Sequence, residues 1–368
     1  MLRLERRSEQ SWWTALASPA IALFLTLLTG FLLLLALGKD PAAGLYYLFL
    51  EPVTVAWSLE EVLVKATPLA LIAAGLALCF KANVWNIGAE GQFIVGAIAG
   101  SSLPVLLPDV QGPHVLPIML ACGVAGGAAF ALIPAVLKVR FATNEILVSL
   151  MLVYVSELFL DWLVRGPWRN PEGFNFPETR QFHAWATMPV IGDSRLNVGA
   201  IFTVVVCLLL AFVLSRTYLG FGARLSGTAP LAARFAGISR DRVVILVMAV
   251  SGGLAGLAGV MEVAGPIGQL RTQISPGYGF TAIIVAFLAR LNPAGAILAG
   301  FVLSVTYIGG EAAQIAIGIS DKITRVFQGA LLLFVLASDV FLRYRIRFAV
   351  RLSEPLEPAA EKAGRMSS

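Results

Sequence analysis

The chain has 368 residues, of which 58% are hydrophobic and only 13% are charged, and its formal net charge at pH 7 is +5. A soluble domain carries about a quarter charged residues, so this composition excludes an ordinary soluble domain. Apolar runs of about 20 residues recur along the whole length and indicate one polytopic membrane domain. The basic residues lie in loops and at the ends, so the net charge does not indicate nucleic-acid binding.

The alternation of apolar runs and polar breaks predicts ten membrane-spanning segments. Their ranges are roughly 17–37, 62–80, 87–107, 115–137, 143–164, 197–215, 243–264, 278–290, 293–311 and 321–342. The third and eighth are short or interrupted by glycine and polar residues. The first follows the charged stretch "MLRLERRSEQSWW", and its apolar run is too long for a signal-peptide core, so we interpret it as a retained anchor.

The distribution of Lys and Arg sets the expected orientation. With the N-terminus in the cytoplasm, ten alternating spans leave most Lys and Arg inside, as the positive-inside rule requires. Residues 1–16 and the tail 343–368 are then cytoplasmic and flank a membrane domain over 17–342. The tail is polar and expected to be disordered after Leu352. The loop 165–196 is expected outside, where it rests on the membrane interface or meets an external partner.

The stretch "NVWNIGAEGQFIVG", residues 83–96, brings amides and a carboxylate between two apolar runs. Irregular backbone at membrane depth survives only where protein or water surrounds it. Asn86, Glu90 and Gln92 are therefore candidates to line or brace a solute path. The alternative is a re-entrant loop at the cytoplasmic side, in which Glu90 stabilises a helix start.

A second interrupted segment, "GPIGQLRTQISPGYGFTAIIVAFLARLNP", covers residues 265–293. Its residues Tyr278, Phe280 and Thr281 are further candidates for the path. Two broken segments in corresponding halves are typical of transporters built from internal repeats.

Other acidic and amide groups lie near the ends of spans. Asn144 and Glu145 begin a span at its cytoplasmic end, where capping of the helix explains them and a role in an inner gate is the alternative. Glu157 and Asp161, four residues apart, favour solvation at the outer interface over a proton relay. Glu262 is expected to be solvated at the outer end of its span.

Glycines four residues apart recur in three spans and favour close packing of neighbouring helices. The pairs are Gly96 and Gly100, Gly123 and Gly127, and Gly252 and Gly256.

Several classes of site are not indicated. The three cysteines lie in apolar runs, and the two histidines are too far apart for a metal site, so no metal is expected. No G-x-x-x-x-G-K-[ST] loop occurs, so this chain is not expected to bind ATP in that way. No catalytic set of residues is readable, and an enzyme is not indicated.

The predicted cytoplasmic loop 217–242 contains "PLAARFAG", which predicts a two-turn helix over 230–237. Pro230 suits the first helical position, and Gly237 suits the position just past the end. Leu231 and Phe235 share one face. Since so short a helix is unstable alone in water, it needs a surface to dock on, either a partner or its own membrane domain.

Three stretches resemble one family. "NVWNIGAEGQF" is similar to the signature of bacterial ABC importer permeases for simple sugars and nucleosides, in the superfamily that also holds ribose and branched-chain amino acid permeases. "TNEILVSLML" resembles the segment that follows. "LAARFAGI", "SGGLAGLAGVMEVAG" and "GYGFTAIIVAFLARLNPAGAI" resemble the later half in order and spacing. The resemblance covers about residues 60–340.

This resemblance implies an all-α polytopic membrane protein of about ten helices, a type II-like ABC importer permease with broken helices in both halves. It implies a pore subunit in the bacterial cytoplasmic membrane that takes up nucleosides by alternating access and binds no cofactor itself. ATP and magnesium would be held by a cytoplasmic ATPase. The other implied partners are a second permease, as a copy or a different chain, and an external binding protein or lipoprotein.

The same resemblance implies that residues 230–237 form a coupling helix that docks on the ATPase. The residues that match this role are Arg224, Pro230, Leu231, Arg234, Phe235 and Gly237.

Two departures affect the details. Ala229 stands where the family usually has asparagine, which weakens the helix start by about 1 kcal/mol unless Thr228 substitutes. Val153 stands where the family commonly has asparagine, so the solute can differ. A permease for a simple sugar or another small polar solute, an ion-coupled secondary transporter and a non-transporting scaffold are the alternatives.

Overall fold

The computed structural model describes residues 2–6, 12–192 and 194–348, and most of this part is helical. The first half contains α1 (Trp12–Ala36), α2 (Pro41–Leu45), η1 (Tyr46–Leu50), α3 (Glu51–Thr54), α4 (Ala56–Lys81), α5 (Ala89–Leu106), α6 (Val115–Phe141) and α7 (Glu145–Arg165). The second half contains η2 (Ala184–Ala186), α8 (Gly199–Arg216), α9 (Tyr218–Thr228), α10 (Pro230–Phe235), α11 (Arg240–Glu262), η3 (Val263–Ile267), α12 (Tyr278–Leu288), α13 (Pro293–Ile317) and α14 (Asp321–Arg343). The strands β1 (Leu2–Arg6) and β2 (Tyr344–Phe348) pair antiparallel. The predicted disorder after Leu352 falls outside the described residues.

Each of the ten predicted spans coincides with a helix, and the prediction of a polytopic all-α membrane fold is confirmed. Within the described part of the chain, seven helices are long and apolar enough to cross a membrane. Helix α12 has 11 residues. At 1.5 Å per residue it is about 16 Å long, roughly half of the hydrocarbon thickness. It is therefore a half-helix inside the bundle.

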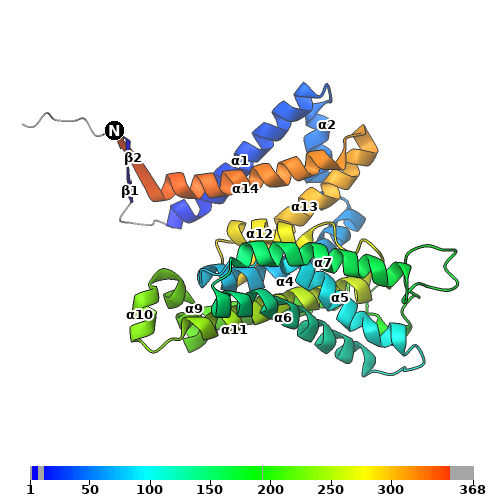
Figure 1. Cartoon of the computed structure of the whole chain (residues 1–368). Coiled ribbons are helices and arrows are strands. Elements are labelled where there is room, and N and C mark those ends of the chain that lie inside the picture. The colour runs from blue at the N-terminus through cyan, green and yellow to red at the C-terminus, as the bar shows by residue number, and fades with distance from the viewer. Residues whose placement is uncertain (1, 7–11, 193, 349–368) are drawn as a thin grey trace, which may run out of the picture.

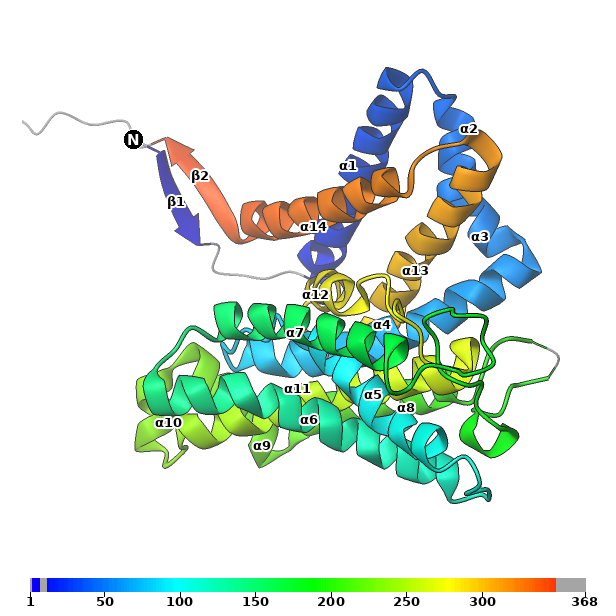
Figure 2. The same ribbon diagram turned by 45° about the vertical axis from the view of Figure 1, so that its right-hand side comes forward.

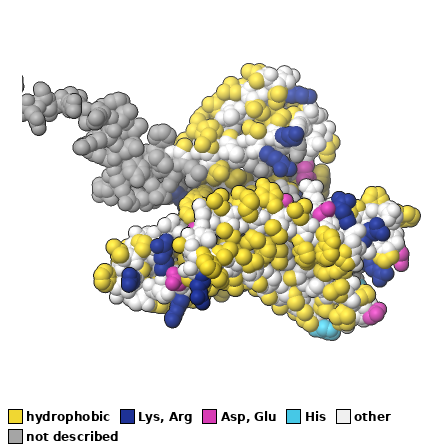
Figure 3. Space-filling view, viewed as in Figure 1, with side chains coloured by type: hydrophobic (Ala, Val, Ile, Leu, Met, Phe, Trp, Pro, Cys, Tyr) yellow, Lys and Arg dark blue, Asp and Glu magenta, His cyan; other side chains and the backbone are white. Residues whose placement is uncertain are grey.

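The helices form two layers (Figures 1 and 2). Helices α4, α6, α7 and α11 run roughly side by side in one layer, with α5 crossing them obliquely, and α1 packs along α14 in the other, with α12 and α13 between the layers. Helices α9 and α10 lie at one end of the bundle, and the loop 166–198 lies at the opposite end. Figure 3 shows an apolar surface over the middle of the larger layer, with Lys and Arg near both ends. This distribution fits a bilayer around the middle.

The central helices α5, α6 and α11 approach so closely that glycine is required at their contacts. A Cβ at Gly96 would meet the backbone of Gly256. A Cβ at Gly127 would meet the carbonyl oxygen of Gly252, and one at Gly123 would lie 3.2 Å from the carbonyl oxygen of Gly256. The predicted role of the glycine pairs in helix packing is confirmed. We call α5, α6 and α11 the glycine-packed trio.

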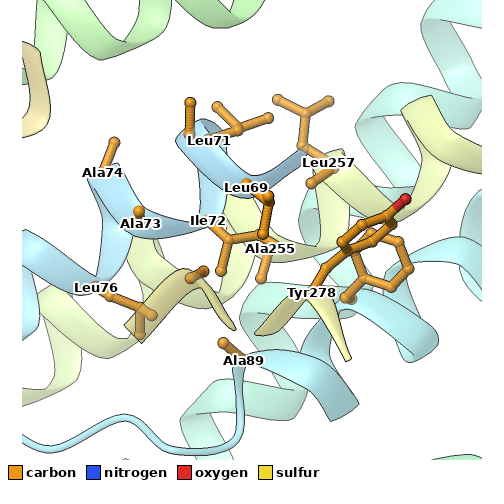
Figure 4. Close-up of a cluster of buried hydrophobic side chains, with 14 of the residues drawn as sticks. Leu69, Leu71, Ile72, Ala73, Ala74, Leu76, Ala89, Ala255, Leu257 and Tyr278 are labelled. Atoms are coloured by element: carbon orange, nitrogen blue, oxygen red, sulfur yellow. The ribbon is translucent and has the colours of Figure 1, made fainter. Parts of the chain in front are cut away.

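Apolar side chains of α4 pack against α11 of this trio. Figure 4 shows Leu69 and Ile72 of α4 with Ala255 of α11, close to the ring of Tyr278 at the start of α12. The short helix α12 is thus anchored in the main apolar core, which also positions its first turn beside the first turn of α5.

Two helical segments were not predicted. Residues 41–54 form α2, η1 and α3, with Asp40 accepting a hydrogen bond from Ala42 N at 2.9 Å at the start. A Cβ at Gly309 of α13 would meet the backbone of Leu48, so this segment packs tightly on α13. Helix α9 also lies in what was expected to be a loop. These helices are too short to show a full apolar repeat, and they depend on tertiary contacts.

Candidate functional site

The polar segment between α4 and α5 is buried and internally paired. Asn86 Nδ2 donates to Gln92 Oε1 at 2.8 Å, and Gln92 Nε2 donates to Asn86 Oδ1 at 2.8 Å. Asn86 Nδ2 also donates to Ser251 Oγ at 3.0 Å, and Gly88 N donates to Asn86 Oδ1 at 3.2 Å. The two amides therefore brace the irregular backbone against α11, because burial makes unpaired amides costly.

Glu90 joins the two broken segments. It lies in the first turn of α5, and its Oε2 accepts a hydrogen bond from Gly279 N, in the first turn of α12, at 2.5 Å. The backbones are in contact as well, since a Cβ at Gly279 would meet the backbone of Glu90. A carboxylate at a helix N-terminus is favoured by the free N–H groups and the helix dipole. Glu90 therefore stabilises a helix start, as the alternative interpretation predicted, but the helix is α12 and not α5, which carries Glu90.

A line of buried hydroxyl and carboxyl groups continues along α12. Tyr278 OH donates to Glu262 Oε1 at 3.4 Å, and Thr281 Oγ1 lies 2.7 Å from Tyr307 OH. The rings of Tyr278 and Tyr307 meet edge to face, with centroids 6.2 Å apart. The prediction that Glu262 is solvated is wrong: it is buried, and residues of α4 and of the loop before α8 lie around it, together with Tyr278 OH.

The predicted path residues are thus brought together in part. Asn86, Glu90, Gln92, Tyr278 and Thr281 are all buried around the starts of α5 and α12. Phe280, in contrast, has 39% of its surface exposed.

Sequence reasoning missed three members of this buried polar group: Ser251, Glu262 and Tyr307. The argument applied to Glu90, an ionisable group inside an apolar run, also fits Glu262. Ser251 and Tyr307 carry no such signal, because single hydroxyl groups are common in membrane helices.

The turn between α6 and α7 lies at the α10 end of the bundle. Asn144 caps α7 by accepting from Ile146 N at 3.0 Å, which confirms the capping interpretation. Glu145 binds Lys138 Nζ and accepts from Trp85 N at 3.4 Å. This corner is therefore tied to the loop that carries Asn86. At the other end of α7, Asp161 pairs with Arg165 at 2.7 Å on the surface.

Three aromatic rings pack beside this corner. The centroids of Phe80 and Trp85 are 5.1 Å apart, and Phe80 and Phe287 stack at 5.3 Å. The rings come from the end of α4, the loop 82–88 and the end of α12. We call Phe80, Trp85 and Phe287 the aromatic cluster.

A pocket of about 660 Å³ lies away from this group, between η1, the start of α4 and the end of α13. Trp57, Glu60 and Glu61 line it, with Arg195 pairing with Glu61 at 2.6 Å. Lys65 lies 3.8 Å from Glu311, another residue of its wall. None of the predicted path residues lines this pocket.

Helix α10 presents apolar side chains to the outside. Pro230 is at its first position, and Gly237 follows its end with φ +76°, as predicted. Leu231 is 75% exposed and Phe235 is 93% exposed. Helix α10 therefore does not bury these side chains on its own membrane domain. Arg224 and Arg234 are also exposed beside it.

The suggestion that Thr228 caps α10 is wrong. Its hydroxyl donates to the carbonyl oxygen of Arg224 at 2.9 Å in the preceding helix, and Ala229 supplies no side-chain cap. Within residues 2–6, 12–192 and 194–348, no group of three or more His, Cys, Asp and Glu could hold a metal ion.

The family described as branched-chain amino acid transport system / permease component matches residues 58–336. A glucose ABC transporter permease protein of Haloferax volcanii is 36% identical, covering 95% of this chain and 94% of the relative. A nucleoside ABC transporter permease protein of Lactococcus lactis is 29% identical over 94% and 97%. A guanosine ABC transporter permease protein of Bacillus subtilis is 28% identical over 90% and 94%. The chain accordingly belongs to the ABC transporter permease family described as branched-chain amino acid transport system / permease component.

Proposed function

We propose that this chain forms the solute path of an ATP-driven importer and that its solute is a nucleoside. The nucleoside and guanosine permeases that match over at least 90% of this chain support this choice of solute. Ribose hydroxyls and base edges are the groups that amides, carboxylates and tyrosine hydroxyls recognise by hydrogen bonding.

The observation that carries the ATP-driven mechanism is the exposure of Leu231 and Phe235 on α10. The exposure of two large apolar side chains on a two-turn helix is explained if a partner covers them. We propose that this partner is a cytoplasmic ATPase, with Arg224 and Arg234 at the rim of the contact. Both chain ends then lie in the cytoplasm, and the loop 166–198 faces an external receptor.

In this mechanism the chain performs no chemistry. ATP binding draws the ATPase subunits together, and α10 moves with them. The movement changes which end of the path is open between this chain and a second permease, as a copy or a different chain. The groups around the starts of α5 and α12 are buried in the conformation of this structure. They become accessible to the solute only in a second conformation, in which the path is open.

Transport by membrane vesicles containing the assembled complex tests the proposal. ATP should drive uptake of radiolabelled guanosine, and a non-hydrolysable ATP analogue should not. Uptake that persists with the analogue, or that follows an imposed ion gradient, would identify a secondary transporter. Failure of any ATPase to purify with the chain would favour a non-transporting scaffold.

A simple sugar is the second candidate solute, and the 36% identical glucose permease supports it. Both solutes present a ring with several hydroxyl groups. ATPase activity of the reconstituted complex, measured with its receptor and either guanosine or glucose, distinguishes them. Stimulation by glucose alone would replace nucleoside with sugar and leave the ATP-driven mechanism intact.

A further inference from the structure

We propose that Gly227 of α9 transmits the movement of α10 to the loop 82–88, and that this loop and the aromatic cluster close the solute path at that end. The proposal rests on the ATP-driven function above. It assigns a positioning role to a residue that binds neither solute nor partner.

The first step is a backbone contact between α9 and the end of α4. A Cβ at Gly227 would meet the carbonyl oxygen of Lys81 and would lie 3.0 Å from the carbonyl carbon of Ala82. Backbone atoms cannot move aside as a flexible side chain can, so only glycine permits this approach. Helix α9 therefore rests directly on the chain just before the loop 82–88.

The second step is the link between α9 and α10. Helix α9 ends at Thr228, and α10 begins at Pro230, so a single residue joins them. Ala229 N donates to Leu225 O, and Ala233 N donates to Ala229 O, so hydrogen bonds continue across the junction. Ile238, just after α10, lies beside α9, since a Cβ built onto Gly222 would be 3.7 Å from its side chain. The two helices form one angled unit, and a displacement of α10 also displaces α9.

The third step leads from the loop to the path. Ala82 is followed within four residues by Trp85 and Asn86. Trp85 packs in the aromatic cluster with Phe80 and Phe287, which connects the loop to the end of α12. Asn86 holds Gln92 of α5. A shift at Ala82 would thus move both the aromatic cluster and the amide pair.

The fourth step is the restraint that holds this closed arrangement. Glu145 binds Lys138 and accepts a hydrogen bond from Trp85 N. The α6–α7 corner therefore holds the loop at Trp85, and α9 contacts the chain at Lys81 and Ala82, where the loop begins. The loop is thus attached both to a fixed support and to an element that moves with the partner.

The test compares two glycine variants on the same helix. A Cβ at Gly222 would have only ordinary contacts, 3.7 Å and 3.8 Å from Ile238. Gly227→Ala should lower the amount of solute taken up per ATP hydrolysed by about tenfold. Gly222→Ala should stay within about twofold of the unchanged complex. Both complexes are first checked for assembly with the ATPase. An unchanged ratio for Gly227→Ala would overturn the proposal.

A reporter of loop movement keeps the test decisive even where Gly227→Ala does not assemble. In a complex with Cys79, Cys122 and Cys207 replaced by Ala, the half-buried Ile87 is changed to Cys. ATP with vanadate should change its rate of modification by a thiol reagent by about threefold or more. The exposed Ala232 of α10, changed to Cys in a second complex, reports contact with the ATPase.

The two reporters separate the possible failures. A nucleotide-dependent change at Ala232→Cys with none at Ile87→Cys would overturn the transmission through Gly227 and leave the ATP-driven function standing. No change at either position, together with no ATP-dependent uptake, would instead contradict the function itself.

Discussion

The segment 82–93 and the helix α10 both depart from the usual distribution of side chains, in opposite directions. The segment buries Asn86, Glu90 and Gln92 inside a membrane bundle, and each has a hydrogen-bond partner there. Helix α10 leaves Leu231 and Phe235 exposed. The buried polar groups of the segment find their hydrogen-bond partners within the chain, so they form a structural brace in this conformation. No described residue covers these two apolar side chains, which is why we propose that another molecule does.

The largest effect is expected at α10. Phe235→Asp replaces an exposed apolar anchor with a charge, and we expect a loss of transport of about thirtyfold or more while the protein still inserts. The ATPase should no longer co-purify. Phe174→Asp is the matched control, because Phe174 is 94% exposed at the opposite end of the bundle and should retain the ATPase. Normal transport by Phe235→Asp would mean that α10 is not the docking element.

The glycine-packed trio should be the next most sensitive region. Gly256→Ala forces a methyl group against the backbone of α6, where Gly123 and Gly127 lie. We expect the free energy of unfolding in detergent to fall by about 1–3 kcal/mol. Gly329→Ala on α14, where nothing lies within 4 Å of the added carbon, should be neutral or up to about 1 kcal/mol stabilising. Equal effects at both sites would show that the close approach is not required.

Glu90 allows the brace to be tested separately from the solute. Glu90→Ala leaves the Gly279 N–H without its buried acceptor, so unfolding should become easier by about 1–3 kcal/mol. Glu90→Gln keeps an oxygen acceptor and should lose less. Thermal unfolding and uptake are measured on both variants. A stable Glu90→Gln protein with a large loss of solute affinity would show that the carboxylate contacts the solute.

The smallest effect is expected for the amide pair. A double-mutant cycle on Asn86→Ala and Gln92→Ala should give a coupling energy of about 0.5–3 kcal/mol. Asn86→Ala combined with Gln328→Ala, which removes a buried amide on α14, should be additive within about 0.5 kcal/mol. Gln92→Ala should also change uptake or solute affinity, and an unchanged solute profile would leave it a purely structural residue.

The sequence was sufficient for the parts of the fold that rest on local patterns. Long apolar runs predicted the helices, and glycines spaced four residues apart predicted close helix packing, though not which helices meet. The Pro230 and Gly237 pair predicted α10, and Asn144 predicted the cap of α7.

The parts that could not be predicted depend on contacts between distant residues. Glu90 and Gly279 are 189 positions apart, so nothing local shows that the carboxylate stabilises the start of α12. Glu262 looked solvated because it ends a helix, yet residues of α4 and of the loop before α8, distant in sequence, lie around it and it is buried. Segment 41–54 has too few apolar residues for a span, and its packing on α13 decides its structure.

The direct backbone contacts among α5, α6 and α11 also constrain how this molecule can change shape. Interlocking side chains can exchange one arrangement of rotamers for another, but hydrogen atoms of glycine offer no second arrangement to adopt. We therefore expect the three helices to move as one block, with the hinges of the proposed transport cycle at its margins, in the chain on either side of α12 and around α9.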